Sequence, residues 1–145
     1  MTIRVITILL VSCFSTAIIS AQLKDSVLCT YTLENATIDT SLGDELRNAF
    51  EDDDGRPMKS ISIDLNGDGK YEKFIPNEFL CGNGGCPWII FDPQSKHIIG
   101  EIGANEIIVL KRKINGYNVL QCSWSGAGEY KLTNYIFKGS KYVEK

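Results

Sequence analysis

The densest chemistry of this sequence lies in nine residues, D-L-N-G-D-G-K-Y-E, at positions 64–72. Oxygen-bearing side chains occupy alternate positions of this stretch and then its ninth position. Calcium binds roughly six to eight oxygens from carboxylates, amides, backbone carbonyls and water. Alternate side chains of a tightly curled loop converge, and glycine permits the sharp turn. The pattern predicts a calcium site formed by Asp64, Asn66, Asp68, the carbonyl of Lys70, and Glu72.

The motif D-x-N-G-D-G-x-x-E resembles the calcium loop of integrin-like (FG-GAP) β-hairpin modules, D-x-D-x-D-G-x-x-D. It also resembles the first half of an EF-hand or dockerin loop, but an EF-hand needs a bidentate glutamate where this chain has Ile75. The FG-GAP resemblance covers nine residues and implies a calcium hairpin between two strands. Asn66 and Glu72 depart from its consensus, although both are oxygen donors. A polar N-G-D-G turn without metal is the alternative.

A broader resemblance covers most of the chain from Ser60 onward. The sequence resembles small exported bacterial β-domains of uncharacterised function. In these a D-L-N-G-D-G hairpin precedes a C-G-x-G-G-C loop, and a G-x-G-E-Y…Y-x-F-x-G-x-x-Y strand pair ends the domain. The resemblance implies an exported β-domain and brings no known activity with it.

The first 21 residues predict a secretory signal peptide. They hold one early cation, Arg4, then an apolar run without charge, and Ala21 is a small residue at a plausible cleavage point. A membrane anchor is one alternative, although the segment is barely long enough and is diluted by Ser12, Ser15, Thr16 and Ser20. L-V-S-C at residues 10–13 resembles a lipobox, which would make Cys13 a lipid-modified terminus. We expect an exported, periplasmic or extracellular domain over residues 22–145, without a stable membrane span after cleavage.

The charge distribution also bears on the function class. Residues 22–80 carry 6 basic and 13 acidic side chains, whereas residues 81–145 carry 8 and 5. The acidic half suits a cation. Nucleic-acid binding requires a strongly basic domain, so this class of function is excluded.

The cysteines predict disulfides. Four of the five lie after the signal segment, and an even number in an exported chain indicates two bridges with three possible connectivities. Three glycines in C-G-N-G-G-C let a short loop close, which favours a Cys81–Cys86 bridge. The remaining bridge would join Cys29 to Cys122.

Hydrophobic periodicity predicts the elements that position these residues. Ser41 can cap a helix in S-L-G-D-E-L-R-N-A-F, where Leu42, Leu46 and Phe50 share a face. From residue 58 the period is two, and strands alternate with short turns. Asn115-Gly116 is a strong two-residue hairpin signal. We expect a mainly β fold: an antiparallel meander forming a sandwich or small barrel, with one short N-terminal α-helix. The expected strands cover residues 27–33, 60–65, 70–75, 88–92, 96–102, 106–113, 117–124, 130–137 and 141–143.

Catalytic signals are few. His97 is the one histidine, and no G-x-S-x-G elbow occurs. We therefore predict a protein that is not an enzyme; an enzymatic reading would need acids such as Asp92 or Glu129 in one pocket. The leading hypothesis is an exported calcium-binding β-domain acting as a binding module for a protein or cell-envelope component.

Two glycine loops, C-G-N-G-G-C-P-W and S-W-S-G-A-G-E-Y, each stand beside a tryptophan, a residue that interfaces favour. Trp88 is expected in the core because it precedes I-I-F. The second loop resembles, with a spacing that differs by one residue, the S-G-x-x-Y segment of periplasmic lysozyme inhibitors of the membrane-bound C-type class. That resemblance implies the alternative function, a periplasmic inhibitor or immunity protein against a cell-wall hydrolase of the lysozyme or amidase type. The predicted partner-binding residues are Trp124, Ser125, Gly126 and Tyr130.

Overall fold

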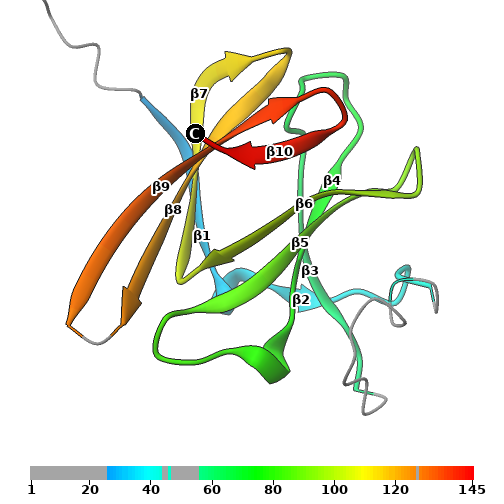
Figure 1. Ribbon diagram of the computed structural model, residues 1–145. Coiled ribbons are helices and arrows are strands. Elements are labelled where there is room, and N and C mark those ends of the chain that lie inside the picture. Colours follow the sequence, from blue (N-terminus) through cyan, green and yellow to red (C-terminus); the bar gives the residue numbers. More distant parts are fainter. Residues whose placement is uncertain (1–25, 44–45, 47–55, 127) are drawn as a thin grey trace, which may run out of the picture.

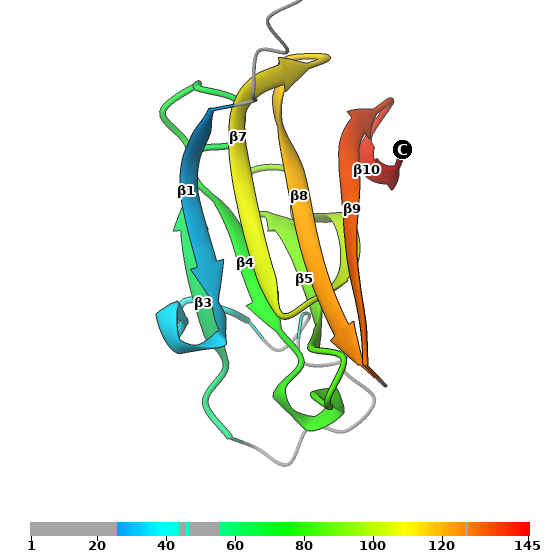
Figure 2. The ribbon, with the colours of Figure 1, turned by 90° about the vertical axis from the view of Figure 1, so that its left-hand side faces the viewer.

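The chain folds as a sandwich of two five-stranded antiparallel sheets, seen face-on in Figure 2. A computed structural model describes residues 26–43, 46, 56–126 and 128–145. Sheet A has the order β1-β7-β8-β9-β10 and sheet B the order β2-β3-β4-β5-β6 (Figure 1). The strands of sheet A are β1 (Val27–Thr32), β7 (Glu106–Ile114), β8 (Tyr117–Gly126), β9 (Glu129–Lys138) and β10 (Lys141–Glu144). Those of sheet B are β2 (Thr37–Ile38), β3 (Lys59–Ile63), β4 (Glu72–Pro76), β5 (Cys86–Asp92) and β6 (His97–Ala104).

The strand order confirms the predicted antiparallel meander. Strands β2 to β6 are neighbours in chain order, the chain then changes sheets at Asn105, and β7 to β10 follow in the same way. Strand β1 returns to the free side of β7. Asn115 and Gly116 join β7 to β8 with φ angles of 52° and 86°, as a two-residue hairpin turn with both central residues at positive φ requires.

The core lies between the sheets. Phe74, Leu65 and Ile90 are fully buried, and so is Trp88, as expected, with its indole N–H donating to the carbonyl of Ala104 at 3.1 Å. Gly100 of β6 lets β10 pack closely, because a Cβ at that position would lie 3.1 Å from the Cβ of Tyr142. The two sheets therefore share one core, and β6 and β10 pack closely at Gly100.

The predicted helix lies mostly outside the described residues, as do the predicted signal peptide and Cys13. Leu42 and Leu46 are buried on the outer face of sheet B, where they pack with Ile75. The described part of the chain has two isolated 3-10 turns, η1 (Leu33–Asn35) and η2 (Glu78–Leu80). Within the described ranges, no helix has the length and apolar character needed to cross a membrane.

One of the two expected disulfides is formed. Cys81 and Cys86 are bonded, with an S–S distance of 2.03 Å. The expected second bridge is not formed: Cys29 and Cys122 are both free thiols. Cys29 lies in β1 and Cys122 in β8, and β7 runs between them. Two strand spacings amount to about 9.5 Å, beyond the roughly 7 Å between Cα atoms that a disulfide can span.

Candidate functional site

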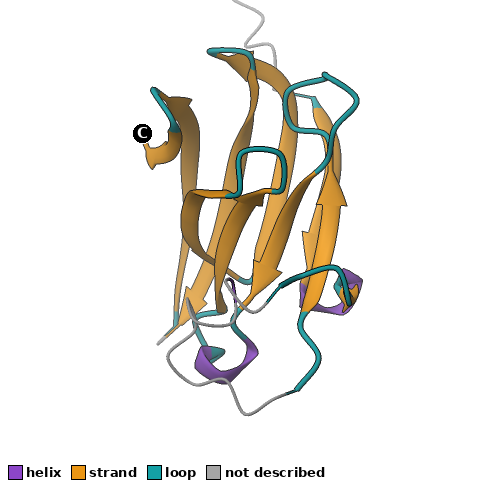
Figure 3. Cartoon of the chain, turned by 90° about the vertical axis from the view of Figure 1, so that its right-hand side faces the viewer, coloured by secondary structure: helices purple, strands orange, loops and turns teal. Residues whose placement is uncertain are grey.

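The predicted site residues lie at opposite ends of the sandwich. Strands β3 and β4 are joined at one end by residues 64–71, near the β7–β8 turn; we call this the hairpin end. At the other end are the Cys81–Cys86 loop, the corner at Asn105 and the tip of the β8–β9 hairpin; we call this the glycine-loop end. Figure 3 shows loops gathered at both ends, with the strands between them. The two candidate sites are therefore separate and are described in turn.

At the hairpin end, the carboxylate of Asp64 organises the loop. One of its oxygens accepts from the backbone N–H of Gly67 at 2.6 Å and of Asp68 at 3.2 Å, and the other accepts from that of Gly69 at 2.9 Å. Gly67 and Gly69 have φ angles of 83° and 81°, which explains why glycine stands at both positions. The backbone bond from Gly69 most strongly holds the pKa of Asp64 below its ordinary value. The loop therefore favours a charged Asp64.

The next two side chains continue this pattern. The Oδ1 of Asn66 accepts from the backbone N–H of Asp68 at 2.9 Å, and the Oδ1 of Asp68 accepts from that of Lys70 at 2.8 Å. Each carboxylate oxygen has two lone-pair positions, so these bonds leave acceptor capacity on Asp64 and Asp68. Carboxylate and amide oxygens are the type of donor that calcium takes in proteins.

Glu72, the ninth residue of the motif, lies inside the protein with an exposed fraction of 3%. Its Oε2 accepts from the backbone N–H of Leu65 at 2.8 Å. Burial raises the pKa of Glu72, and the nearby carboxylates of Asp92 and Asp68 add to this, while the bond from Leu65 opposes it. Among the described residues, no three Asp, Glu, His or Cys side chains are grouped as a metal site would require. The predicted ligands share one loop but their carboxylates are not gathered.

Sheet A holds this loop in place, through contacts that the sequence analysis missed. The backbone N–H of Asn118 donates to the carbonyl of Leu65 at 2.7 Å, and the Nζ of Lys113 donates to the carbonyl of Asn66 at 2.6 Å. The buried side-chain amide of Asn118 also donates to the carbonyl of Leu110 at 2.6 Å. The backbone carbonyl of Asn118 accepts from the hydroxyl of Tyr142 at 2.9 Å. Asn118 is thus the hub between the loop and sheet A.

At the glycine-loop end, the two glycine loops meet at Trp124. A Cβ at Gly84 would overlap the indole nitrogen of Trp124, and one at Gly126 would lie 2.8 Å from its Cζ2. The indole is therefore packed on glycine backbone from both loops, yet 38% of Trp124 remains exposed. The sequence predicted the two loops separately, and the structure brings them together.

The other predicted partner residues lie on the same hairpin. Ser125 is paired with Tyr130 across the β8–β9 ladder, and its hydroxyl accepts from the side-chain amide of Asn105 at 2.6 Å. Successive residues of a strand point to opposite faces. Tyr130, which is 66% exposed, therefore lies on the outer face of sheet A, while Trp124 points toward the Cys81–Cys86 loop. The four predicted residues share a hairpin but present two surfaces.

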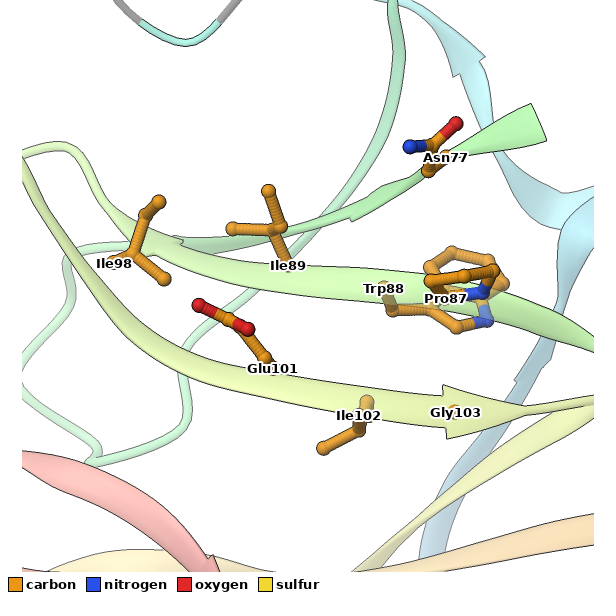
Figure 4. A pocket seen from close by; sticks show the side chains of 8 residues that line it. All are labelled: Asn77, Pro87, Trp88, Ile89, Ile98, Glu101, Ile102 and Gly103. Atoms are coloured by element: carbon orange, nitrogen blue, oxygen red, sulfur yellow. The ribbon is translucent and has the colours of Figure 1, made fainter. Parts of the chain in front are cut away.

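A shallow depression of about 430 Å³ lies on the outer face of sheet B (Figure 4). Ile89 and Ile98 line one part of it, and Glu101 extends over it from β6. A single carboxylate beside aliphatic side chains offers no acid–base pair. Asp92 lies near the hairpin end and Glu129 at the opposite end, so the pair named for an enzymatic reading is not brought into one pocket.

No protein-family model, curated protein or solved structure matches this chain. The function is therefore argued from the geometry of the two ends.

Proposed function

We propose that this protein is an exported, non-enzymatic binding module whose two ends have different functions. The hairpin end binds calcium, which stabilises the fold, and the glycine-loop end binds a protein or cell-envelope component. The observation that carries this proposal is the placement of Trp124. A large aromatic side chain is held between two glycine loops and remains 38% exposed.

This arrangement suits binding for an energetic reason. Fixing a flexible side chain on association costs about 0.5 to 1.5 kcal/mol. Gly84 and Gly126 already confine the indole, and the Cys81–Cys86 bridge confines one of the loops, so much of that cost is met before a partner arrives. Phe79 (38% exposed) and Leu80 (58% exposed) precede the same loop in the chain and are further exposed apolar side chains.

Two alanine substitutions in one loop test the binding surface. Gly84→Ala inserts a methyl group where the indole lies, whereas a Cβ at Gly82 meets nothing within 4 Å. We expect a cell-envelope component captured by the wild type to be lost with Gly84→Ala and Trp124→Ala but retained with Gly82→Ala. Equal capture by all four proteins would overturn the proposed surface.

Calcium binding at the hairpin end is supported by the donor set. Asp64, Asn66 and Asp68 alternate around a loop that two positive-φ glycines bend, as a cation-encircling loop needs. Calcium held by Asp64, Asp68, the Lys70 carbonyl and Glu72 would also offset the cost of burying the Glu72 carboxylate, whose exposed fraction is 3%. The metal would fix the β3–β4 connection rather than take part in chemistry.

Thermal unfolding with calcium and with chelator tests this site. A ligand at 100 times its Kd stabilises the folded state by about 2.7 kcal/mol. We expect that gain in the wild type and its loss in Asp68→Ala and Glu72→Gln. Lys70→Ala is the matched control, because it keeps the backbone carbonyl and should keep the calcium response. Identical melting temperatures of the wild type in calcium and chelator would remove calcium from the proposal.

A second candidate function, inhibition of a cell-wall hydrolase, is supported by the β8–β9 hairpin. Ser125 is held by Asn105, and Tyr130 stands exposed beside it, so the hairpin presents a fixed hydroxyl and an exposed aromatic side chain that could enter a cleft. Inhibition of lysozyme and peptidoglycan amidase activity by the wild type, reduced at least tenfold by Ser125→Ala with Tyr130→Ala, would establish this function. Absence of inhibition across both enzyme classes would leave the binding module alone.

A further inference from the structure

The partner surface includes an open strand edge, and this inference rests on the binding function proposed above. Strand β9 pairs with β8 from Glu129 to Tyr135. On its other side it pairs with β10 only from Tyr135 to Lys138, and the backbone N–H of Lys145 reaches Asn134 at 2.9 Å. The first half of β9 therefore has a neighbour on one side only among the described residues.

The ladder determines which backbone groups are open. Hydrogen bonds alternate along an antiparallel strand, so successive residues point their N–H and C=O to opposite sides. Asn134 points its carbonyl toward β10, since it accepts from Lys145. Tyr130 and Leu132 lie an even number of residues from Asn134, so their backbone N–H and C=O point to the same side of the strand, which is the open side. Lys131 and Thr133 direct theirs to β8.

The other open edges of the described sheets are shorter or bulged; the free side of β3, for example, covers only residues 61–63. Natural edge strands are commonly short, bulged or covered. Strand β2 has two residues, β1 has a register shift between Val27 and Cys29, and the β5–β6 ladder has one between Ile90 and Phe91. The β8–β9 ladder shows no register shift along its length.

Side chains and charge indicate what this edge would accept. Tyr130 is 66% exposed and Leu132 47% exposed, and both lie on the outer face of sheet A. A residue paired directly opposite either of them would point to the same face and contact it. Within the open half of β9, Glu129 and Lys131 are the charged residues, and Lys131 lies 3.4 Å from Glu144. The open edge is therefore apolar on one face and has no net charge of its own.

We propose that the open half of β9 binds an extended peptide segment of the partner that carries apolar residues at alternate positions. The peptide adds to sheet A as an antiparallel strand in line with β10. It exchanges backbone hydrogen bonds with Tyr130 and Leu132 and places apolar residues against their side chains. Strand addition of this kind takes affinity from main-chain bonds and specificity from alternate side chains.

Amide hydrogen exchange of the full chain with a capped peptide, E-V-T-V-T-V-E, tests the proposal. In the free protein we expect fast exchange at Tyr130 and Leu132 and slow exchange at Lys131 and Thr133. Saturating peptide should slow the first pair at least tenfold and leave the second pair unchanged. N-methylation of one alternate set of peptide residues should abolish binding, and methylation of the other set should change it less than threefold.

Two variants at one position separate backbone from side chain. Leu132→Pro removes an N–H that β8 does not use, and it should abolish peptide binding while the fold persists. Leu132→Ala keeps the N–H and should weaken binding only a few-fold. Equal binding by Leu132→Pro, or no protection at Tyr130 and Leu132, would overturn the inference. Concentration-dependent protection without peptide would also overturn it, because a second copy would then occupy the edge. The Gly84→Ala capture experiment is independent, so failure of either proposal is recognisable.

Discussion

At the hairpin end of the sandwich, hydrogen bonds between polar groups join sheet A to the β3–β4 loop, whereas at the glycine-loop end an indole packed on glycine backbone joins sheet A to the Cys81–Cys86 loop. Asn118 and Lys113 connect sheet A to the β3–β4 loop. Trp124 connects sheet A to the Cys81–Cys86 loop, which is closed covalently.

This difference bears on function. At the hairpin end the side chains of Asp64, Asp68 and Glu72 accept hydrogen bonds from the loop's own backbone, so they stabilise the loop whether or not a ligand is bound. At the glycine-loop end the closing residue leaves part of an aromatic ring exposed. The hairpin end is therefore suited to a structural role and the glycine-loop end to recognition.

The largest expected effect is at the hairpin end. Asn118→Ala removes the donor to the carbonyl of Leu110, in a side chain that is 3% exposed. A buried acceptor left without a partner costs about 1 to 3 kcal/mol. We expect a loss of about 2 to 3 kcal/mol in the free energy of unfolding, measured in urea with chelator present.

Gln121→Ala is the control for Asn118→Ala. Gln121 lies on the same strand, is only partly buried, and makes a longer bond of 3.3 Å to Asn134. We expect it to cost less than about 1 kcal/mol. Equal losses for the two variants would show that the buried side-chain bond from Asn118 to Leu110 contributes no more than a partly buried one.

Removing the Cys81–Cys86 disulfide should give the next largest loss of folding stability. A disulfide that closes a loop of about six residues stabilises the fold by roughly 2 kcal/mol on the chain-entropy estimate. Replacing both Cys81 and Cys86 by serine should cost about that much. It should also alter the fluorescence of Trp124, which packs on Gly84 of the same loop. The calcium response at the hairpin end should not change; if it did, the two ends would not be independent.

The sequence predicted most of the fold because the signals for it are local. The alternation of apolar residues located nine of the strands, and Asn115-Gly116 located one hairpin. Strand β2 was missed, since its two residues pair with Lys59 and Ser60 and have no period of their own. The Cys29–Cys122 bridge failed for a related reason: cysteine parity carries no information about β7 lying between them.

The candidate sites were predicted less completely. The motif at residues 64–72 showed which side chains have oxygen donors, but not that Glu72 is buried or that Asn118 and Lys113 hold the loop. The glycine loops suggested two partner surfaces, but their meeting at Trp124 is a tertiary contact. Only the three-dimensional arrangement relates residues that lie 40 positions apart.

A polar contact on sheet B gives a smaller effect, and one that depends on pH. Asp39 accepts from Ser60 at 2.5 Å and forms an ion pair with Lys73. Partial burial acts to raise the pKa of Asp39, but the bonds from Lys73, Ser41 and Ser60 prevail and hold it well below 3.8. A depressed pKa contributes stability that is complete above the unfolded-state value and is lost as the pH falls below it.

Asp39→Asn should therefore cost about 1 to 2 kcal/mol at pH 7 and remove part of the acid destabilisation below about pH 4. Chemical unfolding at pH 7 and at pH 3 measures both. Ser41→Ala removes only one bond to the same carboxylate and should give the same pattern at smaller amplitude. If the variant and the wild type lost stability in parallel below pH 4, Asp39 would not be the group responsible.

The smallest loss of folding stability is expected for Lys113, which contacts the β3–β4 loop directly. Lys113 is exposed and donates to the carbonyl of Asn66 at 2.6 Å, beside Gly67. In chelator, Lys113→Met should cost less than about 1 kcal/mol, as exposed charged contacts do. In calcium the same change should tighten binding about three- to fivefold, because it removes a positive charge beside the loop. Lys111→Met is the control, since its exposed side chain lies on the same strand two residues away. Titration calorimetry of both variants decides: equal calcium affinities would mean that Lys113 holds the loop without acting on a cation bound there.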